Sequence, residues 1–412
     1  MRSDATAVEG TPADVIDVRP ARPNEYDAVI EMVERRFTQG DAARIVDGTL
    51  RHDPRFRPEH LRVGLVNGKL AGMMLFIDRM VRIGTAKVRC GIVAPVATDN
   101  GYEGRGVASE VMRDALKWAT GEGFHISMLW GHTWLYPRYG YAPGLKHYDV
   151  RLPASLTPVG LSGYTMRPVE AADSPAQAIC YHVSTAGTTL AEIRTDDPWE
   201  WRPTDGKQFV EVAVDPVRSV RGYFRAARDE GRIEVREIAA LDDGSAAALF
   251  DRLLVLAAEA GGVEVHITAT PDNRWTRWAM LHGASLTLDG GGGHGMVRVL
   301  DLVGLFRAIR PELERRVGMS EYVARAGGLR LETPAGTVGI RVDHGRVTLG
   351  KGRDAPLVAM PWSGLGALVS GYQGADMLHV HPGVRIEGEA TLRLLQILFP
   401  EGYPHWPVAA YF

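Results

Sequence analysis

The stretch from Val88 to Tyr141 reads VRCGIVAPVATDNGYEGRGVASEVMRDALKWATGEGFHISMLWGHTWLYPRYGY. It starts with a short apolar run, from Val88 to Thr98, that predicts a mostly buried strand. Pro95 lies within this run and has no N–H for a sheet, so we expect an edge position or a bulge there. Apolar residues at helical spacing from Val107 to Trp118 then predict a helix after a glycine loop.

The loop Gly104-Arg105-Gly106 directly precedes this predicted helix. Backbone N–H groups and the partial positive charge of a helix N-terminus together bind phosphate. No Lys-Ser or Lys-Thr pair follows, as a nucleoside triphosphate loop requires, and Ser109 stands where a dinucleotide loop has its third glycine. A pyrophosphate bound without metal fits the loop better, although a glycine-capped surface loop fits the same spacing.

Residues 102–109, YEGRGVAS, resemble the acyl-CoA loop of the GNAT superfamily of N-acetyltransferases, whose pattern is Arg or Gln, two residues, Gly, one residue, Gly or Ala. Gly106 and Ala108 match this pattern, whereas Glu103 stands where the family prefers Arg or Gln. Residues 135–143, LYPRYGYAP, resemble the aromatic turn of one subfamily, the enhanced intracellular survival (Eis) acetyltransferases. The chain length and the aromatic C-terminus are similar too, so the resemblance covers the whole chain.

Composition places the chain among ordinary globular proteins. Its 412 residues are 45% hydrophobic and 24% charged, which is enough for two or three domains. A formal net charge of -3 gives no electrostatic footprint for nucleic acid or an anionic membrane. Two cysteines cannot form a disulfide framework, and the sequence has no apolar stretch of membrane length and no signal-peptide core. We therefore expect a cytoplasmic protein.

The pattern along the chain predicts an α/β (α+β) protein with three domains. An Asn67-Gly68 turn predicts a hairpin, and a helix is expected over 24–37 with Asn24 as its N-cap. A second strand–helix–strand copy begins near Gly163, but Asp242 and Asp243 replace its glycine loop and would repel a pyrophosphate. Gly290–Gly293 marks the next break. The resemblance implies a catalytic GNAT domain at 15–150, a degenerate copy at 151–294 and a sterol-carrier-protein-like domain at 295–412.

The resemblance also implies which residues hold acetyl-CoA. Main-chain groups of the interrupted strand would hold the pantetheine arm, the loop and helix start would hold the pyrophosphate, and the end of the next strand would face the cofactor. In that order these residues are Ala94, Pro95 and Val96; Gly104, Arg105, Gly106, Val107, Ala108 and Ser109; and Gly131 and His132. No metal is expected.

Two residues are candidates for proton transfer. By resemblance Tyr136 is the general acid, because a phenol with a pKa of about 10 can protonate the departing thiolate. Without the resemblance, the tyrosines of this turn are better interpreted as core aromatics. The C-terminal carboxylate of Phe412 would orient the amine and pass on its proton, and His132 is the alternative base.

The function expected from the resemblance is acetyl-CoA-dependent acetylation of a primary amine, in an aminoglycoside-like polyamine or a lysine side chain, by a homohexamer. The alternative is a non-catalytic protein that binds or senses acyl-CoA or lipid, which Glu103 favours. A lipid carrier that uses the last domain is a third interpretation.

Overall fold

A computed structural model describes residues 15–38, 41–160, 163–201, 207–229, 232–262, 264–289 and 295–406. The chain separates into two compact units, one formed by Met1–Ile77 with Val93–Ala119 and the other by Asp78–Ile92 with Thr120–Phe412. Two long strands, β3 (Lys69–Ile83) and β4 (Ala86–Thr98), run from one unit into the other. The elements are a mixture of helices and strands throughout, which confirms the predicted α/β class.

The first unit begins with a short strand and two helices. Its elements, besides parts of β3 and β4, are β1 (Ile16–Pro20), η1 (Pro23–Glu25), α1 (Tyr26–Arg36), α2 (Ala42–His52), η2 (Pro58–His60), β2 (Leu61–Val66) and most of α3 (Val107–Gly121). β2 and β3 are antiparallel and joined at Asn67-Gly68, as predicted. The predicted cap at Asn24 is wrong, because this residue lies inside the 3-10 turn and α1 begins at Tyr26. α2 has no counterpart in the prediction.

Strand β4 is an interior strand, so of the two alternatives predicted from Pro95 the edge position is wrong and the bulge stays a prediction. In its sheet β4 lies between β3 and β5 (Ile126–Trp130). The parallel pairing with β5 joins Cys90–Ile92 to Ile126–Met128. Pro95 lies beyond this paired stretch, which is how the strand accommodates a residue without an N–H.

Helix α3 packs directly on the backbone of β2 and β3. Its buried face includes Val107 and Val111. A Cβ added at Gly64 would lie 2.8 Å from Val111 Cγ2, and one at Gly72 would lie 2.7 Å from Val107 Cγ1. The two glycines therefore allow the close approach that fixes the start of α3.

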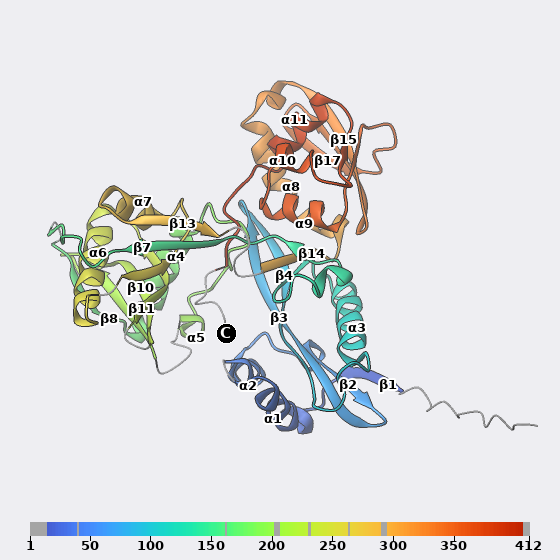
Figure 1. Cartoon of the computed structure of the whole chain (residues 1–412). Helices are drawn as coiled ribbons and strands as arrows, with labels where there is room; N and C mark the ends of the chain where they lie inside the picture. Colours follow the sequence, from blue (N-terminus) through green and yellow to red (C-terminus); the bar gives the residue numbers. More distant parts are fainter. Residues whose placement is uncertain are drawn as a thin grey trace, which may run out of the picture. The chain divides into compact units, whose positions relative to one another are not determined.

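The second unit completes a sheet with a strand from much later in the chain. β14 (Gly295–Val299) pairs antiparallel with β5 and with the short β6 (Ala142–Pro143). Figure 1 labels β14, whose colour marks its late place in the sequence. Conversely, β7 (His147–Leu152) pairs with strands of the second repeat. The predicted domain ranges remain a prediction, and strand pairing crosses two of their boundaries.

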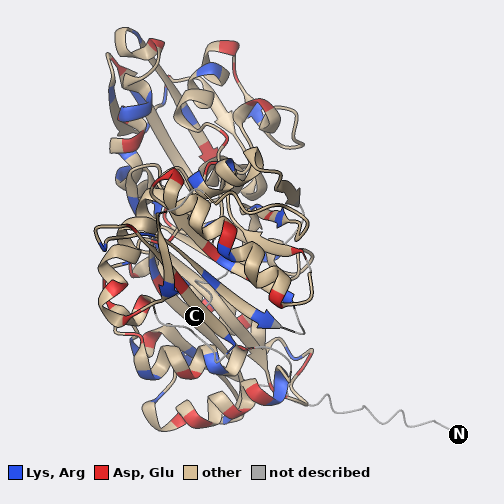
Figure 2. Cartoon of the chain, turned by 90° about the vertical axis from the view of Figure 1, so that its left-hand side faces the viewer, with Lys and Arg blue, Asp and Glu red and all other residues tan. Residues whose placement is uncertain are grey.

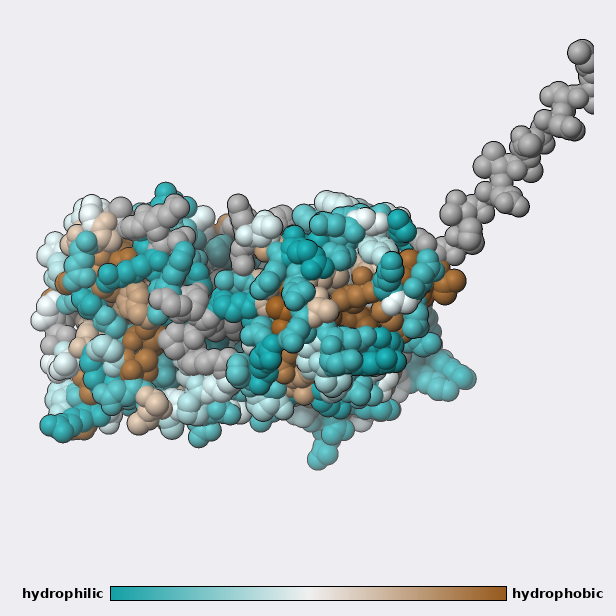
Figure 3. Space-filling view, turned by 90° about the horizontal axis from the view of Figure 1, so that it is seen from below, coloured by the Kyte–Doolittle hydropathy of each residue, from teal (hydrophilic) through white to brown (hydrophobic). Residues whose placement is uncertain are grey.

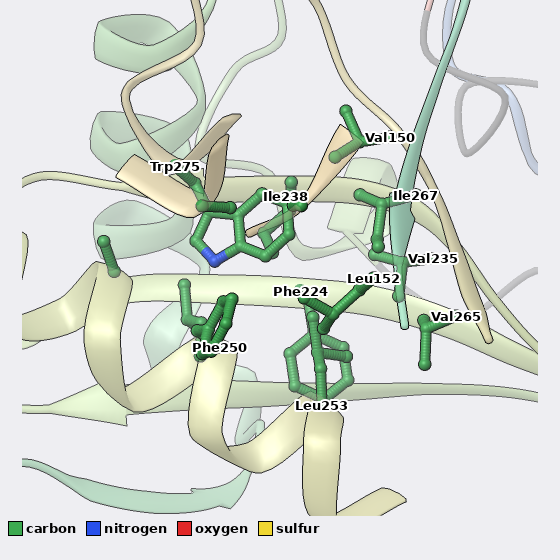
Figure 4. Packing of buried hydrophobic residues seen from close by; sticks show 14 of the residues in the cluster. Val150, Leu152, Phe224, Val235, Ile238, Phe250, Leu253, Val265, Ile267 and Trp275 are labelled. Carbon is green, nitrogen blue, oxygen red and sulfur yellow. The ribbon is translucent and has the colours of Figure 1, made fainter. Parts of the chain in front are cut away.

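A seven-stranded sheet with helices on both faces forms the second repeat, in the order β13-β7-β12-β11-β10-β9-β8. Besides β7, its elements are β8 (Thr165–Pro168), η4 (Ala171–Asp173), α4 (Ser174–Ser184), α5 (Pro198–Trp201), β9 (Gln208–Val214), β10 (Val220–Asp229), β11 (Arg232–Ala240), α6 (Asp243–Glu259), β12 (Val265–Thr268), α7 (Arg274–Leu281) and β13 (Ser285–Asp289). Figure 4 shows Phe250 and Leu253 of α6 packed toward Ile238 and Trp275 in one core. Cys180 and Tyr181 of α4 belong to a separate cluster.

Two features repeat between the halves, the first as the sequence predicts and the second found only in the structure. The parallel pair β11 and β12 is connected through α6, just as β4 and β5 are connected through α3. Each half also has an arginine strap, meaning an arginine of its first strand that holds a carboxylate six residues later with both terminal nitrogens. Arg19 binds Glu25 at 2.8 and 2.6 Å, and Arg167 binds Asp173 at 2.7 and 2.8 Å.

The last part of the chain forms a five-stranded sheet, ordered β17-β16-β15-β18-β19, with helices. Its elements are α8 (Leu302–Gly318), η6 (Glu321–Ala324), β15 (Ala326–Thr333), β16 (Gly336–Asp343), β17 (Arg346–Gly350), β18 (Leu357–Ala359), α9 (Trp362–Ser370), α10 (Ala375–Leu378), β19 (Arg385–Ile386) and α11 (Glu389–Leu398). Hydrophobic periodicity in the sequence predicts helices over 302–317 and 392–399 and a meander of strands over 329–349, and the structure confirms all three. The likeness to a sterol carrier protein stays a prediction. The predicted break at 290–293 lies outside the described residues.

Positions of basic and acidic residues are interspersed along the ribbon in Figure 2. Hydrophilic residues cover much of the face in Figure 3, with hydrophobic residues in separate patches. Within the described ranges, no helix combines the length and apolar character needed to cross a membrane. The two cysteines, Cys90 in β4 and Cys180 in α4, are free thiols buried in the interior, and burial raises the pKa of both.

Candidate functional site

The glycine loop before α3 is held in a conformation that glycine favours. Gly101, Gly104 and Gly106 have φ angles of 83°, 75° and 86°, in the left-handed region. A Cβ added at any of the three would meet nothing within 4 Å. The glycines are therefore required by the backbone path and not by crowding, and the space beside the loop is open.

The start of α3 supplies donors at the end of this loop. The first N–H groups of an α-helix have no partner within the helix, and the helix dipole adds partial positive charge there. α3 begins at Val107, so the predicted segment Gly104–Ser109 forms the loop and first turn. This arrangement can bind a phosphate group without a metal.

Glu103, the departure from the GNAT pattern, is paired within the first unit. Its carboxylate lies 2.9 Å from Arg36 Nη1 and accepts the Gly101 N–H at 2.8 Å. Backbone hydrogen bonds, from its own N–H and that of Gly101, lower the pKa of Glu103, and Arg36 adds to this effect. The carboxylate is thus ionised, and Arg36 offsets the charge that would oppose a pyrophosphate.

The last turn of α1 holds the loop at two further points, which sequence reasoning missed. Arg36 Nη1 donates to Asn100 Oδ1 at 2.6 Å, and Arg35 Nη2 donates to Asp99 Oδ2 at 3.0 Å. Adjacent arginines at a helix C-terminus are common because they complement the helix dipole, so the sequence carried no specific signal for these contacts.

The β4 segment expected to hold the pantetheine arm is more accessible than its neighbours. Ala94, Pro95 and Val96 are half-buried, whereas Val93 and Ala97 on either side are buried. Their main-chain contacts to a cofactor remain a prediction.

In the second unit, Gly131 and Tyr136 are brought together after β5. The N–H groups of Leu135 and Tyr136 donate to His132 O at 2.9 and 3.4 Å, which turns the chain back on itself. Tyr136 opens a 3-10 turn, η3 (Tyr136–Tyr139). A Cβ added at Gly131 would lie 2.6 Å from Tyr136 Cε2, so the tyrosine ring packs on the glycine backbone.

The Tyr136 phenol suits a proton donor. Burial, with a contribution from Tyr139, raises its pKa above the ordinary value of 10.0, so the group stays protonated at neutral pH. Among the described residues its hydroxyl has no hydrogen-bond partner. His132, the alternative base, is exposed, and its ring stacks on Trp134 with centroids 5.4 Å apart.

The other two tyrosines of the turn are core residues. Tyr141 is 1% exposed, and its hydroxyl lies 2.6 Å from Ser127 Oγ, which donates to Gly91 O at 2.8 Å. Tyr139 is also buried. The interpretation as core aromatics therefore holds for these two and leaves Tyr136 as the accessible phenol of the turn.

Residues close to the C-terminus of the chain lie near the end of β5. Lys146 N donates to Pro404 O at 2.8 Å, and His405 N donates to Thr189 O at 3.1 Å. The Trp406 ring then lies 6.2 Å from the ring of Trp130, the last residue of β5. The predicted catalytic Phe412 lies outside the described residues.

The equivalent position in the second repeat is filled by side chains. Asp242 caps α6, because its carboxylate accepts a hydrogen bond from the Ser245 N–H at 2.8 Å. The same carboxylate accepts hydrogen bonds from the Tyr164 hydroxyl at 2.9 Å and from Arg221 Nε at 3.0 Å. In the same repeat, Asn273 Nδ2 donates to Ile238 O of β11 at 3.0 Å. In the part of this repeat that the structure describes, the start of α6 is therefore occupied by the Asp242 side chain, and the absence of an acyl-CoA site here stays a prediction.

A comparison with protein families finds one model, described as an acetyltransferase (GNAT) domain, that matches residues 17–144. A comparison with curated proteins finds no match. The fold of nearly the whole chain is similar to solved structures of GCN5-related N-acetyltransferases from Kribbella flavida (TM-score 0.75, 20% identity, 96% of this chain and 98% of that one) and Anabaena variabilis (TM-score 0.75, 17% identity, 95% and 99%).

Eis1 from Mycobacterium abscessus is also similar in fold (TM-score 0.67, 16% identity, 96% of this chain and 100% of that one). At these identities the likeness concerns the fold alone, so the Eis-type subfamily remains a prediction. The glycine loop, the first part of α3 and the Tyr136 turn all lie within the matched segment. Residues 17–144 are therefore a GNAT-type acetyltransferase domain, and acetyl transfer is the activity that this match supports for the protein.

Proposed function

We propose that the protein transfers the acetyl group of acetyl-CoA to a primary amine by direct attack on the thioester. The observation that carries this proposal is the open glycine loop at the start of α3, inside the matched acetyltransferase segment. The N–H groups of Gly104–Ser109 would bind the pyrophosphate, and the main chain of Ala94–Val96 would bind the pantetheine arm. Gly131 and His132 would lie along the thioester end.

The chemistry requires two proton transfers. The amine nitrogen attacks the thioester carbon, a C–N bond forms, and the C–S bond breaks to release the CoA thiolate. The Tyr136 phenol donates its proton to this thiolate. The carboxylate of Phe412 accepts a proton from the amine through water, and solvent exchange restores both groups. Atoms balance as amine plus acetyl-CoA giving amide plus CoA thiol.

The acceptor we propose is an aminoglycoside-like polyamine or a lysine side chain. The support is the Eis-like turn around Tyr136 together with the fold shared with Eis1. The same resemblance underlies the proposals of a cytoplasmic homohexamer and of a sterol-carrier-protein-like domain over 295–412.

Thiol release from acetyl-CoA tests the proposal, with spermidine, kanamycin and a lysine peptide as acceptors. Tyr136→Phe is expected to lower kcat by about 10²-fold while the Kd for acetyl-CoA stays unchanged, because general acid catalysis contributes about that much. Tyr139→Phe is the matched control, since it removes the neighbouring phenol of the same turn and leaves the Tyr136 hydroxyl in place. Equal loss in both variants would contradict the role of Tyr136.

A chain extended by several residues beyond Phe412 tests the terminal carboxylate. We expect turnover to be lost while acetyl-CoA binding persists. Full turnover in the extended chain would exclude Phe412 as the base and favour His132.

The second candidate function is a non-catalytic acyl-CoA or lipid-binding protein, favoured by Glu103 at the usual Arg or Gln position. It predicts acetyl-CoA binding without thiol release for any acceptor. Turnover that depends on Tyr136 excludes it.

A further inference from the structure

The five-stranded sheet in the last part of the chain has a cavity that the proposed acetyl transfer does not use. Its volume is about 610 Å³, within the range of small-molecule sites, which is about 300–1,000 Å³. It is lined by β15, β16, β17 and the loop from Gly352 to Pro356, which follows β17. Figure 1 labels β15 and β17, and all the lining residues belong to the second unit.

The cavity lies on the face of the sheet that is turned away from the core. Side chains alternate between the two faces of a strand. The alternate residues of β16 that are buried in the core are Val338, Ile340 and Val342. Gly339 and Arg341 therefore belong to the opposite face. In the register of β17, Gly350 is opposite Gly339 and Thr348 is opposite Arg341, so all four lie on the cavity side.

Glycines make room for the loop on this face. A Cβ added at Gly339 would overlap the backbone of Gly352, and one at Gly352 would lie 2.7 Å from Gly339 Cα. The loop therefore lies directly on the strand. Arg330 N donates to Pro356 O at 2.8 Å, and Arg330 Nη1 donates to Arg353 O at 3.0 Å, which holds the loop in place.

Beside the loop, the backbone of the sheet is uncovered. A Cβ added at Gly350 would meet nothing within 4 Å, although Gly350 pairs with Gly339. The φ angle of Gly350 is not positive, so its conformation does not require glycine. Glycine inside a strand often marks a place where another backbone or a ligand approaches closely. The loop backbone approaches at Gly339, and the space at Gly350 is open to a ligand.

The polar side chains around this space can be reached from solvent. Arg341, Thr348, Arg353 and Asp354 are all exposed. Among the described residues, the only partner of the Arg341 side chain is Asp343, at 3.5 Å. The side chains of Arg353 and Asp354 have no partner in that part of the chain. Two guanidinium groups and a hydroxyl can bind an anion, and one carboxylate remains for hydrogen-bond donors.

We propose that this cavity binds a nucleoside 5′-monophosphate. Phosphate alone would match the two arginines but would leave the carboxylate of Asp354 facing an anion. A nucleotide also carries two hydroxyl donors on its ribose. The phosphate binds Arg341, Arg353 and Thr348. The ribose hydroxyls donate to Asp354, and the flat base lies on the uncovered backbone at Gly350. This site is separate from the glycine loop before α3, which belongs to the first unit.

Isothermal titration of the full chain with three matched probes tests this proposal. AMP carries phosphate, ribose and base, adenosine lacks the phosphate, and ribose 5-phosphate lacks the base. We expect AMP to bind at least about tenfold more tightly than either of the other two, because each of them loses one group of contacts. AMP binding no tighter than either probe, or no heat and no thermal stabilisation with AMP, would overturn the proposal.

Three variants locate the site. Arg341→Gln and Arg353→Gln are each expected to weaken AMP about tenfold and to leave adenosine unchanged, because only phosphate contacts are lost. Gly350→Val is expected to weaken AMP and adenosine alike, because it puts a side chain that suits a strand into the open space. Arg346→Gln removes an exposed arginine of β17 that does not line the cavity, and this control should bind AMP as the native chain does.

The same variants separate this site from the glycine loop of the first unit. AMP bound at that loop would be insensitive to all three changes, and such a result would contradict the proposal. All three positions are exposed, so the variants are expected to fold, and thermal denaturation checks this.

Discussion

The starts of α3 and α6 occupy the same place in two repeats and differ in what fills them. At α3, Gly104 and Gly106 leave open space beside the helix end. At α6, the carboxylate of Asp242 accepts the Ser245 N–H that would otherwise be free for a ligand. The strand–helix–strand frame is the same in both, so a few side chains and not the fold decide whether an anion can bind.

The segments that follow the two parallel strand pairs differ in the same way. After β5 the chain makes the short turn that presents the Tyr136 phenol. After β12 it forms α7, and Asn273 at its start uses the main-chain carbonyl of Ile238. In the second repeat a side chain of the protein thus binds a main-chain group of β11. In the first repeat the corresponding main-chain groups of β4 are proposed to bind the cofactor.

Gly106→Asp should have the largest effect, because it gives the open start of α3 a capping carboxylate like the one at the start of α6. We expect acetyl-CoA affinity to fall by about 100-fold or more, through repulsion of the pyrophosphate and loss of open donors. Gly106→Asn is the control, since asparagine has the same size, tolerates positive φ similarly and is uncharged. Equal Kd values for the two variants in calorimetry would mean that backbone strain and not charge controls the site.

Asn273→Ala should destabilise the second repeat by about 2 kcal/mol, because it leaves the Ile238 carbonyl buried without a donor and removes the α7 cap. Urea denaturation monitored by tryptophan fluorescence measures this change. Asn24→Ala is the control: Asn24 is exposed and does not cap α1, so its removal should cost less than about 0.5 kcal/mol. A large effect at Asn24 would restore the cap predicted from sequence.

Asp242→Ala should destabilise the same repeat by about 1 kcal/mol through loss of the N-cap, without creating an acetyl-CoA site. Burial opposes ionisation of Asp242, but hydrogen bonds from Ser245, Tyr164 and Arg221 outweigh it and lower the pKa. A lowered folded-state pKa means that the stabilisation is present above the unfolded value of about 3.9 and is lost as the pH falls below it.

The stability difference between Asp242→Ala and the native chain should therefore be constant near neutral pH and shrink in acid. Asp243→Ala, which removes an exposed neighbouring carboxylate, is the control. A difference that grows toward low pH would contradict the assignment of the cap to an ionised Asp242.

Glu103→Gln should have the smallest effect. It removes one negative charge from the loop and releases Arg36 from its ion pair, so we expect acetyl-CoA to bind about two- to fivefold more tightly at low salt and equally at high salt. Glu34→Gln makes the same charge change on α1, away from the loop, and serves as control. Weaker binding in Glu103→Gln would mean that the Arg36 contact orders the loop for the cofactor.

Local patterns in the sequence predicted much of the fold. The Asn67-Gly68 hairpin, the buried face of α3 and the repeated strand–helix–strand order follow from turn chemistry and hydrophobic periodicity, which act over a few residues. Pairing between distant segments was not predictable in this way. The position of β14 beside β5, and the interior position of β4 despite Pro95, depend on contacts that no local pattern encodes.

The same distinction between local and distant contacts applies to the candidate site. Gly104–Ser109 could be located because its glycines and the helix that follows are adjacent in sequence. The contacts of Arg35 and Arg36 to Asp99, Asn100 and Glu103 could not, because they join α1 to a loop far along the chain. Asn24 was predicted as a cap from its residue type, yet its neighbour Glu25 is drawn to Arg19 and the helix starts later.

The rate at which each buried cysteine is labelled by a thiol reagent would measure how often its own surroundings open. Cys90 lies in β4 and Cys180 in α4, and neither reacts with a polar reagent unless its surroundings open. Labelling rates measured on Cys90→Ser and Cys180→Ser variants therefore report local opening on either side of the duplication. If acetyl-CoA slows labelling at Cys90 and leaves the rate at Cys180 unchanged, the cofactor stabilises the surroundings of one thiol and not of the other.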